Sequence, residues 1–250
     1  MEFYSDDKQV YIDPTKEIDS YRRRADLKHW PTKLIYQPIP WLKVDECFSS
    51  VLIKDLPTLH PGTKLHLLKG KVLYCQGLPG APLTCILIEE LIGLGVQEII
   101  FLGIAGSIQP DITIGNRMIV TEAIRLEGTS YHYLPSEDSA IASSQMRKDL
   151  EEFLAAQGVP FHIGKICSTD APFRETFTLI ETLQKQKALA IDMEISAVFS
   201  VALFREIKVV ALLVISDQLI EEQWTGIKSK EIIKTYQESL EQCYDFFIRK

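Results

Sequence analysis

Residues 71–102 read KVLYCQGLPGAPLTCILIEELIGLGVQEIIFL, and this stretch decides the fold class. It opens with a short apolar, strand-like run that Gly77 closes. Apolar residues then recur at helical spacing over residues 79–94, and Gly95 follows as a typical helix end. Residues 98–102 are nearly all apolar, as expected of a strand buried on both faces. The pattern strand, helix, strand predicts an α/β sheet covered by helices.

The rest of the chain continues this alternation. The pattern predicts strands at residues 117–120, 161–167 and 209–215, and helices at residues 193–204 and 228–247. We therefore expect an α/β fold with a single domain, in which helices flank a mixed, largely parallel central sheet. Residues 1–45 combine prolines and tryptophans with charged residues, so we expect an irregular N-terminal arm there and the domain itself over residues 46–250.

Composition excludes several classes of protein. The 250-residue chain has a formal net charge of −7, whereas a nucleic-acid-binding protein usually presents a basic face. Its one basic cluster, Arg22 to Arg24, is short enough to be a solvated turn or a subunit contact. We therefore expect no nucleic-acid partner.

The cysteines and the N-terminus indicate the compartment. Five cysteines are scattered without metal-ligand spacing, which is typical of reduced thiols, so we expect no metal site. The first residues are acidic and polar, unlike a signal peptide, and the apolar run at residues 209–215 is too short to span a bilayer. The expectation is a soluble, cytoplasmic protein with no membrane contact.

Two carboxylates lie where an α/β fold gathers ligands. Ser216 and Asp217 follow the strand at residues 209–215, and ligands bind at the carboxyl ends of such strands. Asp217 fits a turn cap equally well. Asp192 fits the N-cap of the next helix, because its side chain can accept unpaired amide hydrogens. Glu194 then lies in the first turn, where it either interacts with the helix dipole or grips a ligand diol.

A glycine-containing segment follows the strand at residues 98–102. Gly103, Ile104, Ala105 and Gly106 form a loop in this prediction, but the segment is neither a dinucleotide-binding fingerprint nor a phosphate-binding loop with its lysine. Glycine allows the backbone to approach another group closely. A tight connection out of the strand explains the same residues.

Six motifs, taken together and in order, resemble the nucleoside phosphorylase family, which includes purine and uridine phosphorylases and methylthioadenosine/S-adenosylhomocysteine nucleosidase. They are FLGIAGSI at residues 101–108, IGNRMIV at 114–120, GTSYHYLP at 128–135, STDAPFRE at 168–175, DME at 192–194 and SD at 216–217. The resemblance runs from about residue 69 to the C-terminus.

The resemblance implies an enzyme that breaks the N-glycosidic bond of a nucleoside through an oxocarbenium-like sugar. It assigns Met193 to packing on the ribose and Glu194 to bonding its two hydroxyls. Asp217 becomes the acid that protonates the base, Ser216 a base contact, and Phe173 the aromatic that packs on the base. Because the family's uridine enzymes lack this aspartate, a purine-type base is expected. The resemblance also implies a homo-oligomer and no cofactor, with phosphate as a possible co-substrate.

The family's phosphate-binding residues are degenerate in this chain. The family's early Gly-Asp-Pro-x-x-Arg loop is missing from residues 44–54. Phe101 replaces an expected arginine, and Ile104 replaces an expected hydroxyl residue. Neither side chain offers the hydrogen-bond donors or positive charge that a phosphate dianion needs.

Three interpretations remain open at this point. In the first, water replaces phosphate and the protein is a nucleoside hydrolase, with Asp45, Glu46 and Asp55 as the nearest acids. In the second, it is a phosphorylase whose anion site is rebuilt from other cations. The possible cations are Lys54, Arg125, Arg174 and the cluster Arg22 to Arg24. In the third, it binds nucleosides without catalysis.

Overall fold

A computed structural model describes residues 3–7, 9–25, 27–40, 53–226 and 229–249, with only the backbone described for residues 53, 54 and 229–231. Its strands are β1 (Lys33–Gln37), β2 (Ile53–Leu56), β3 (Lys64–Leu68), β4 (Val72–Gln76), β5 (Glu98–Ser107), β6 (Arg117–Leu126), β7 (Ala140–Ile141), β8 (His162–Thr169), β9 (Ala188–Asp192), β10 (Lys208–Ile220) and β11 (Gln223–Thr225). Its helices are α1 (Pro14–Glu17), α2 (Asp19–Ala25), α4 (Ala81–Gly93), α5 (Ser144–Ala156), α6 (Phe177–Lys185), α7 (Ile195–Phe204) and α8 (Ser229–Arg249), with 3-10 turns at Thr129–His132 and Pro172–Arg174.

The strands form one mixed sheet, in the order β11-β10-β6-β8-β9-β5-β1-β4-β3-β2. Because β10 also pairs with β5, the five strands β5, β10, β6, β8 and β9 close into a ring of pairings. Parallel pairs join β1, β4, β5 and β10 on one side and β6, β8 and β9 on the other. Antiparallel pairs close the ring and form the outer strands, so the expected mixed α/β sheet is confirmed.

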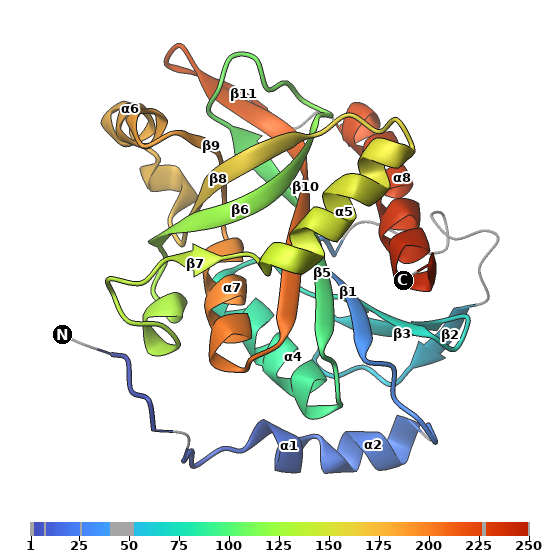
Figure 1. The fold of residues 1–250 in the computed structure, drawn as a ribbon. Helices are drawn as coiled ribbons and strands as arrows, with labels where there is room; N and C mark the ends of the chain where they lie inside the picture. The colour runs from blue at the N-terminus through green and yellow to red at the C-terminus, as the bar shows by residue number, and fades with distance from the viewer. Residues whose placement is uncertain (1–2, 8, 26, 41–52, 227–228, 250) are drawn as a thin grey trace.

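Helices cover both faces of the sheet (Figure 1). On one face, α4 and α7 pack against each other over the largest apolar core, and α1 packs on α4. On the other face, α5 and α8 cover the second core. The buried residues of α8 recur every three or four positions, at Ile232, Tyr236, Leu240, Cys243 and Phe247. This spacing places them on one side of the helix, as its amphipathic sequence predicts.

The N-terminal segment differs from the expected irregular arm. Residues 33–37 form β1, which pairs in parallel with β4 on one side and β5 on the other. Leu34, Ile35 and Tyr36 are fully buried there. The run is short and lies next to prolines, so the sequence pattern does not indicate a strand. Burial between two strands of the sheet stabilises it. No helix in the described ranges has the length and apolar character needed to cross a membrane.

Candidate active site

A single cavity of about 660 Å³ brings together the sequence-predicted site residues except Gly103, which does not line it. Its lining residues come from the ends of β1, β5, β9 and β10 and from the segments before α4 and α6. They are Pro38, Ile39, Pro40, Pro79, Ile104, Ala105, Gly106, Pro172, Phe173, Glu175, Ile191, Asp192, Met193, Glu194, Ser216, Asp217, Leu219 and Trp224. A cavity of this size lies within the ~300–1,000 Å³ typical of small-molecule sites.

Glu194 lies at one end of the cavity, where α7 begins. Only 5% of the residue is exposed, and its Oε1 accepts the backbone N–H of Gly80 at 2.5 Å. Its other oxygen, Oε2, accepts the N–H of Met193 at 3.3 Å. Burial and the nearby charge of Asp192 raise the pKa of Glu194 above its ordinary value. A buried carboxylate that still lines the cavity has acceptor capacity left for a ligand.

Asp192 holds the backbone that presents Glu194. Its carboxylate accepts the N–H groups of Glu194 at 3.0 Å and Ile195 at 2.8 Å, which are unpaired at the start of α7. It also accepts the hydroxyl of Ser168 from β8 at 2.5 Å. Asp192 therefore accepts amide hydrogens at the helix start, as expected, but the N-cap position itself is Glu194, which lies just before the helix rather than within its first turn.

The segment from Gly103 to Gly106 is strand rather than loop, because β5 continues to Ser107. A Cβ on Gly103 would lie 2.6 Å from the ring of Phe101, and a Cβ on Gly106 would lie 2.8 Å from Cδ1 of Leu219 and 3.0 Å from Oδ2 of Asp217. Contacts this short would force the neighbouring atoms to move. The glycines therefore allow neighbouring side chains to approach the β5 backbone, and at Gly106 these are Leu219 and Asp217. Ile104, Ala105 and Gly106 line the cavity.

Asp217 lies inside β10, not at its end, because the strand continues to Ile220. The pairing of β10 with β5 shifts register between Ile215 and Asp217. A bulge of this kind redirects side chains, and here Ser216 and Asp217 both reach the cavity. Oδ1 of Asp217 accepts the Ser216 hydroxyl at 2.5 Å, and its Oδ2 accepts the indole N–H of Trp224 at 2.8 Å.

Met193 and Phe173, the remaining predicted contacts, also line the cavity. Met193 is half-buried between the capping Asp192 and Glu194. Phe173 is fully exposed, on the 3-10 turn between β8 and α6. The ring therefore stands at the rim of the cavity rather than in its wall.

The part of the cavity around Ile104 is apolar. Pro38, Ile39 and Pro40, which directly follow β1, line it together with Pro79. Phe101 does not reach it, because its ring is buried and stacks on Tyr36 at 5.7 Å. No lysine, arginine or histidine among the described residues lines the cavity. Residues 44–52, where the family's phosphate loop was sought, lie outside the described residues.

The other cations proposed for an anion site are engaged elsewhere or exposed. Arg125 is buried, donates to Ser130 and to the carbonyls of residues 134, 135 and 138, and covers the ring of Tyr131 at 4.2 Å. Arg22 donates to the carbonyl of Gly93, at the end of α4 remote from the cavity. The length of α4 separates the two ends by roughly 20 Å. Arg174 is exposed outside the cavity lining, and the side chain of Lys54 is not described.

The acids proposed to activate water are not placed at the cavity. Asp55 accepts a hydrogen bond from His66 across β2 and β3, at 2.6 Å, and does not line the cavity. Asp45 and Glu46 lie outside the described residues. Within the described residues, no group of three or more histidine, cysteine, aspartate or glutamate side chains is arranged to hold a metal ion.

Glu175 and Trp224 are among the cavity residues that sequence reasoning missed. Glu175 lies within a motif quoted above, but nothing in its spacing marks it as a wall residue. Trp224 belongs to β11, which forms a hairpin with β10. The Glu221-Glu222 turn between these strands, with φ of 52° and 58°, carries no glycine or asparagine signal for a hairpin.

Comparisons with known proteins identify the family of this chain. The family model described as the phosphorylase superfamily matches residues 47–249. A uridine phosphorylase from Haemophilus influenzae is 36% identical over 99 residues, which cover 40% of this chain and 39% of that protein. A DeoD-type purine nucleoside phosphorylase from Brevibacillus brevis is 28% identical over 180 residues, or 71% of this chain and 76% of that protein.

A solved structure of uridine phosphorylase from Vibrio fischeri ES114 has the same fold. It superposes with a TM-score of 0.77 at 23% identity and covers 88% of this chain and 92% of that one. The matched segments span about two fifths of the length of several uridine phosphorylases, whereas the family model spans most of the chain. The chain belongs to the phosphorylase superfamily.

Proposed function

We propose that this protein cleaves the N-glycosidic bond of a nucleoside whose base is of the purine type. The observation that carries the proposal is that Glu194 and Asp217, which are 23 positions apart in the sequence, line one cavity of nucleoside size. Each sits in a different chemical setting, one beside a buried helix start and the other beside an indole and a hydroxyl. These settings match the two ends of a nucleoside.

Glu194 would bind the sugar. Its oxygens already accept two backbone N–H groups, and each carboxylate oxygen has a second lone pair. The 2′- and 3′-hydroxyls of a ribose can donate into these positions. Met193 would pack on the sugar ring beside them. Holding both hydroxyls fixes the sugar while positive charge develops on it in the transition state.

Ser216 and Asp217 would bind the base, with Phe173 covering it from the rim. A leaving purine accepts the electron pair of the broken bond, so protonation of a ring nitrogen stabilises the departing base. Asp217 would bond this edge of the base and take part in its protonation. The apolar surfaces of Leu219 and Trp224 in the same wall suit a flat heterocycle.

Water is the nucleophile that the described part of the cavity favours. The apolar lining around Ile104 offers no cation to a phosphate dianion, whereas water needs none. A phosphorylase is the second candidate, and the names of the relatives favour it, because they are uridine and purine nucleoside phosphorylases. Such an enzyme would use phosphate as co-substrate and would need no other cofactor.

The test is base release from inosine, adenosine and uridine, with and without phosphate, followed by identification of the sugar product. Free ribose at the same rate in both buffers supports hydrolysis. Ribose 1-phosphate that forms only with phosphate supports the phosphorylase. Saturable nucleoside binding without any base release would contradict catalysis and leave a binding protein.

A further inference from the structure

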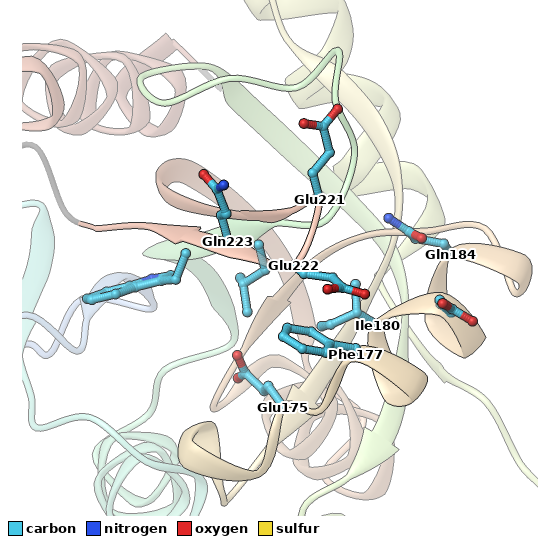
Figure 2. A pocket seen from close by; sticks show the side chains of 10 residues that line it. Glu175, Phe177, Ile180, Gln184, Glu221, Glu222 and Gln223 are labelled. Atoms are coloured by element: carbon cyan, nitrogen blue, oxygen red, sulfur yellow. The ribbon is translucent and has the colours of Figure 1, made fainter.

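Glu175 lines the cavity but has no role in the ribose and base contacts proposed above. It follows the 3-10 turn Pro172–Arg174 and precedes α6, and it lines both the main cavity and a second cavity of about 390 Å³. The two cavities share Glu175, Leu219 and Trp224, so they adjoin at the base end of the main cavity. Figure 2 shows the Glu175 carboxylate below Phe177, on the side of the second cavity away from Glu221.

The carboxyls of Glu175 and Asp217 differ in their hydrogen bonding. Both oxygens of Asp217 accept a hydrogen bond, one from Ser216 and one from Trp224. Among the described residues, no hydrogen bond or ion pair engages the Glu175 carboxyl, which is half-buried. A half-buried carboxyl without donors, next to a carboxylate, is the one that retains a proton.

We propose that Glu175 is a second catalytic acid of this site: it holds the proton that the leaving base receives, while Asp217 binds the edge of the base. The inference rests on the proposed function, because it assigns a residue to the reaction proposed there. Two carboxyl groups near the base would then have different roles, one as proton donor and the other as a binding group.

The proton and electron balance is simple for the hydrolytic reaction. The C1′–N bond breaks, and its electron pair stays with the base. A ring nitrogen of the base takes the proton of the Glu175 carboxyl, which becomes a carboxylate. Water adds to C1′ and loses one proton, which restores the acid form of Glu175 through solvent. Nucleoside and water give free base and ribose, and no oxidant or reductant is needed.

The charges around Glu175 support this role. The other ionisable side chains that line the two cavities near it are all carboxyls, namely Asp217, Glu181, Glu221 and Glu222, and the thiol of Cys167 lies nearby. No lysine, arginine or histidine among the described residues lines either cavity. Burial, and next the charge of Asp217, raise the pKa of Glu175 to about 7. A general acid is most effective when its pKa is close to the working pH.

The test compares two substrates in three proteins: wild type, Glu175→Gln and Glu181→Gln. The glutamine at 181 is the matched control, because it removes one carboxylate from the wall of the second cavity only. One substrate is a purine nucleoside, whose base needs a proton to leave. The other is nitrophenyl riboside, whose phenolate leaves without one. Release of base and of nitrophenolate is measured as kcat/KM.

We expect Glu175→Gln to lower purine nucleoside cleavage by ~10²- to 10⁴-fold, which is the usual contribution of a general acid, and to leave nitrophenyl riboside nearly unaffected. Glu181→Gln should change neither. Equal losses on both substrates, or no loss on either, would overturn the role of Glu175. If wild type releases base from no nucleoside, the proposed function itself fails, and the inference fails with it.

The pH profile is a second readout that a merely structural residue would not change. Wild-type kcat/KM for the nucleoside should carry an alkaline limb near pH 7, because the acid form of Glu175 is lost. Ionisation of Glu194 adds a rise with pH that the Glu175→Gln variant shares. Glu175→Gln should abolish this alkaline limb. Asp217→Asn should shift it to lower pH, because the neighbouring negative charge that raises the pKa of Glu175 is gone. An unchanged limb in both variants would contradict the proposal.

Discussion

Replacing Glu194 by glutamine separates the ribose role of this residue from its role in the fold. Glutamine keeps the shape of the side chain and one acceptor oxygen, which can still accept the N–H of Gly80. The second group becomes an NH₂ donor, placed near the N–H of Met193. The variant therefore loses the negative charge and one of the two acceptors that a ribose diol would use.

The expected size of the effect follows from the two sugar hydroxyls. A hydrogen bond to a charged group contributes ~1.5–3 kcal/mol, against ~0.5–1.5 kcal/mol for a neutral one. Weakening two such bonds gives a loss of about 2–3 kcal/mol, which corresponds to a roughly 30- to 150-fold lower affinity. The pH dependence adds a signature. Because the pKa of Glu194 is raised, wild-type affinity should increase with pH as the carboxylate forms, whereas the variant should show no such rise.

The assay is calorimetric titration with a C-nucleoside, in which a carbon–carbon bond replaces the cleavable bond, so that binding is measured without turnover. Glu152→Gln, on the exposed side of α5, is the matched control for a lost charge. Thermal unfolding at high pH should show the Glu194 variant to be at least as stable as wild type, because it no longer ionises a buried group beside Asp192. Unchanged nucleoside affinity in the Glu194→Gln variant would contradict the ribose-binding role of Glu194.

Asp217→Asn should lower purine nucleoside cleavage by roughly 10- to 150-fold, because it weakens a charged hydrogen bond to the base, with an unchanged unfolding temperature; full activity would show that the base end is misassigned. Trp224→Phe removes the indole N–H that Asp217 accepts, and roughly tenfold lower kcat/KM is expected because the indole is largely exposed; wild-type kinetics would exclude this contribution. Arg125→Met removes a buried guanidinium and leaves the carbonyls of residues 134, 135 and 138 without this donor, so it should cost ~3 kcal/mol of unfolding free energy in urea titrations, against little change if the loop rearranges. Because the pKa of Glu175 is raised to about 7, the stability contributed by its protonated form is present below pH ~4.5 and lost as the pH rises through 7; the unfolding free energy of wild type should fall relative to Glu175→Gln over that interval, and parallel curves would contradict the raised pKa.

Much of the fold could be predicted from hydrophobic periodicity. The strand at residues 98–102 and the amphipathic C-terminal helix carry patterns that tertiary contacts only reinforce. Hydrophobic periodicity does not reveal β1. Its five residues lie between polar and proline-rich segments and are held as a strand by pairing with two neighbouring strands. The sequence pattern also ended β5 too early, because glycine normally signals a turn. Here Gly106 instead makes room for the Asp217 carboxylate across the strand pair.

Site residues could be predicted from the sequence where their role depends on neighbouring residues in the chain. Asp192 ends β9 and precedes an apolar helix, so its bonds to the amides at the helix start could be predicted from spacing. Glu175 and Trp224 could not be found this way, because their place in the wall depends on how a turn and a hairpin fold back over β10. Sequence spacing also could not show that Arg125 donates its hydrogen bonds to the carbonyls of the loop that follows it.

The most direct test of the central claim is a crystal structure of the protein with a purine C-nucleoside. We expect a sugar whose two hydroxyls lie within hydrogen-bond distance, ~2.5–3.2 Å, of the Glu194 carboxylate. We also expect a base whose ring edge lies between Asp217 and Glu175. A nucleoside bound in the reverse orientation, or outside the cavity that these carboxyls share, would contradict it.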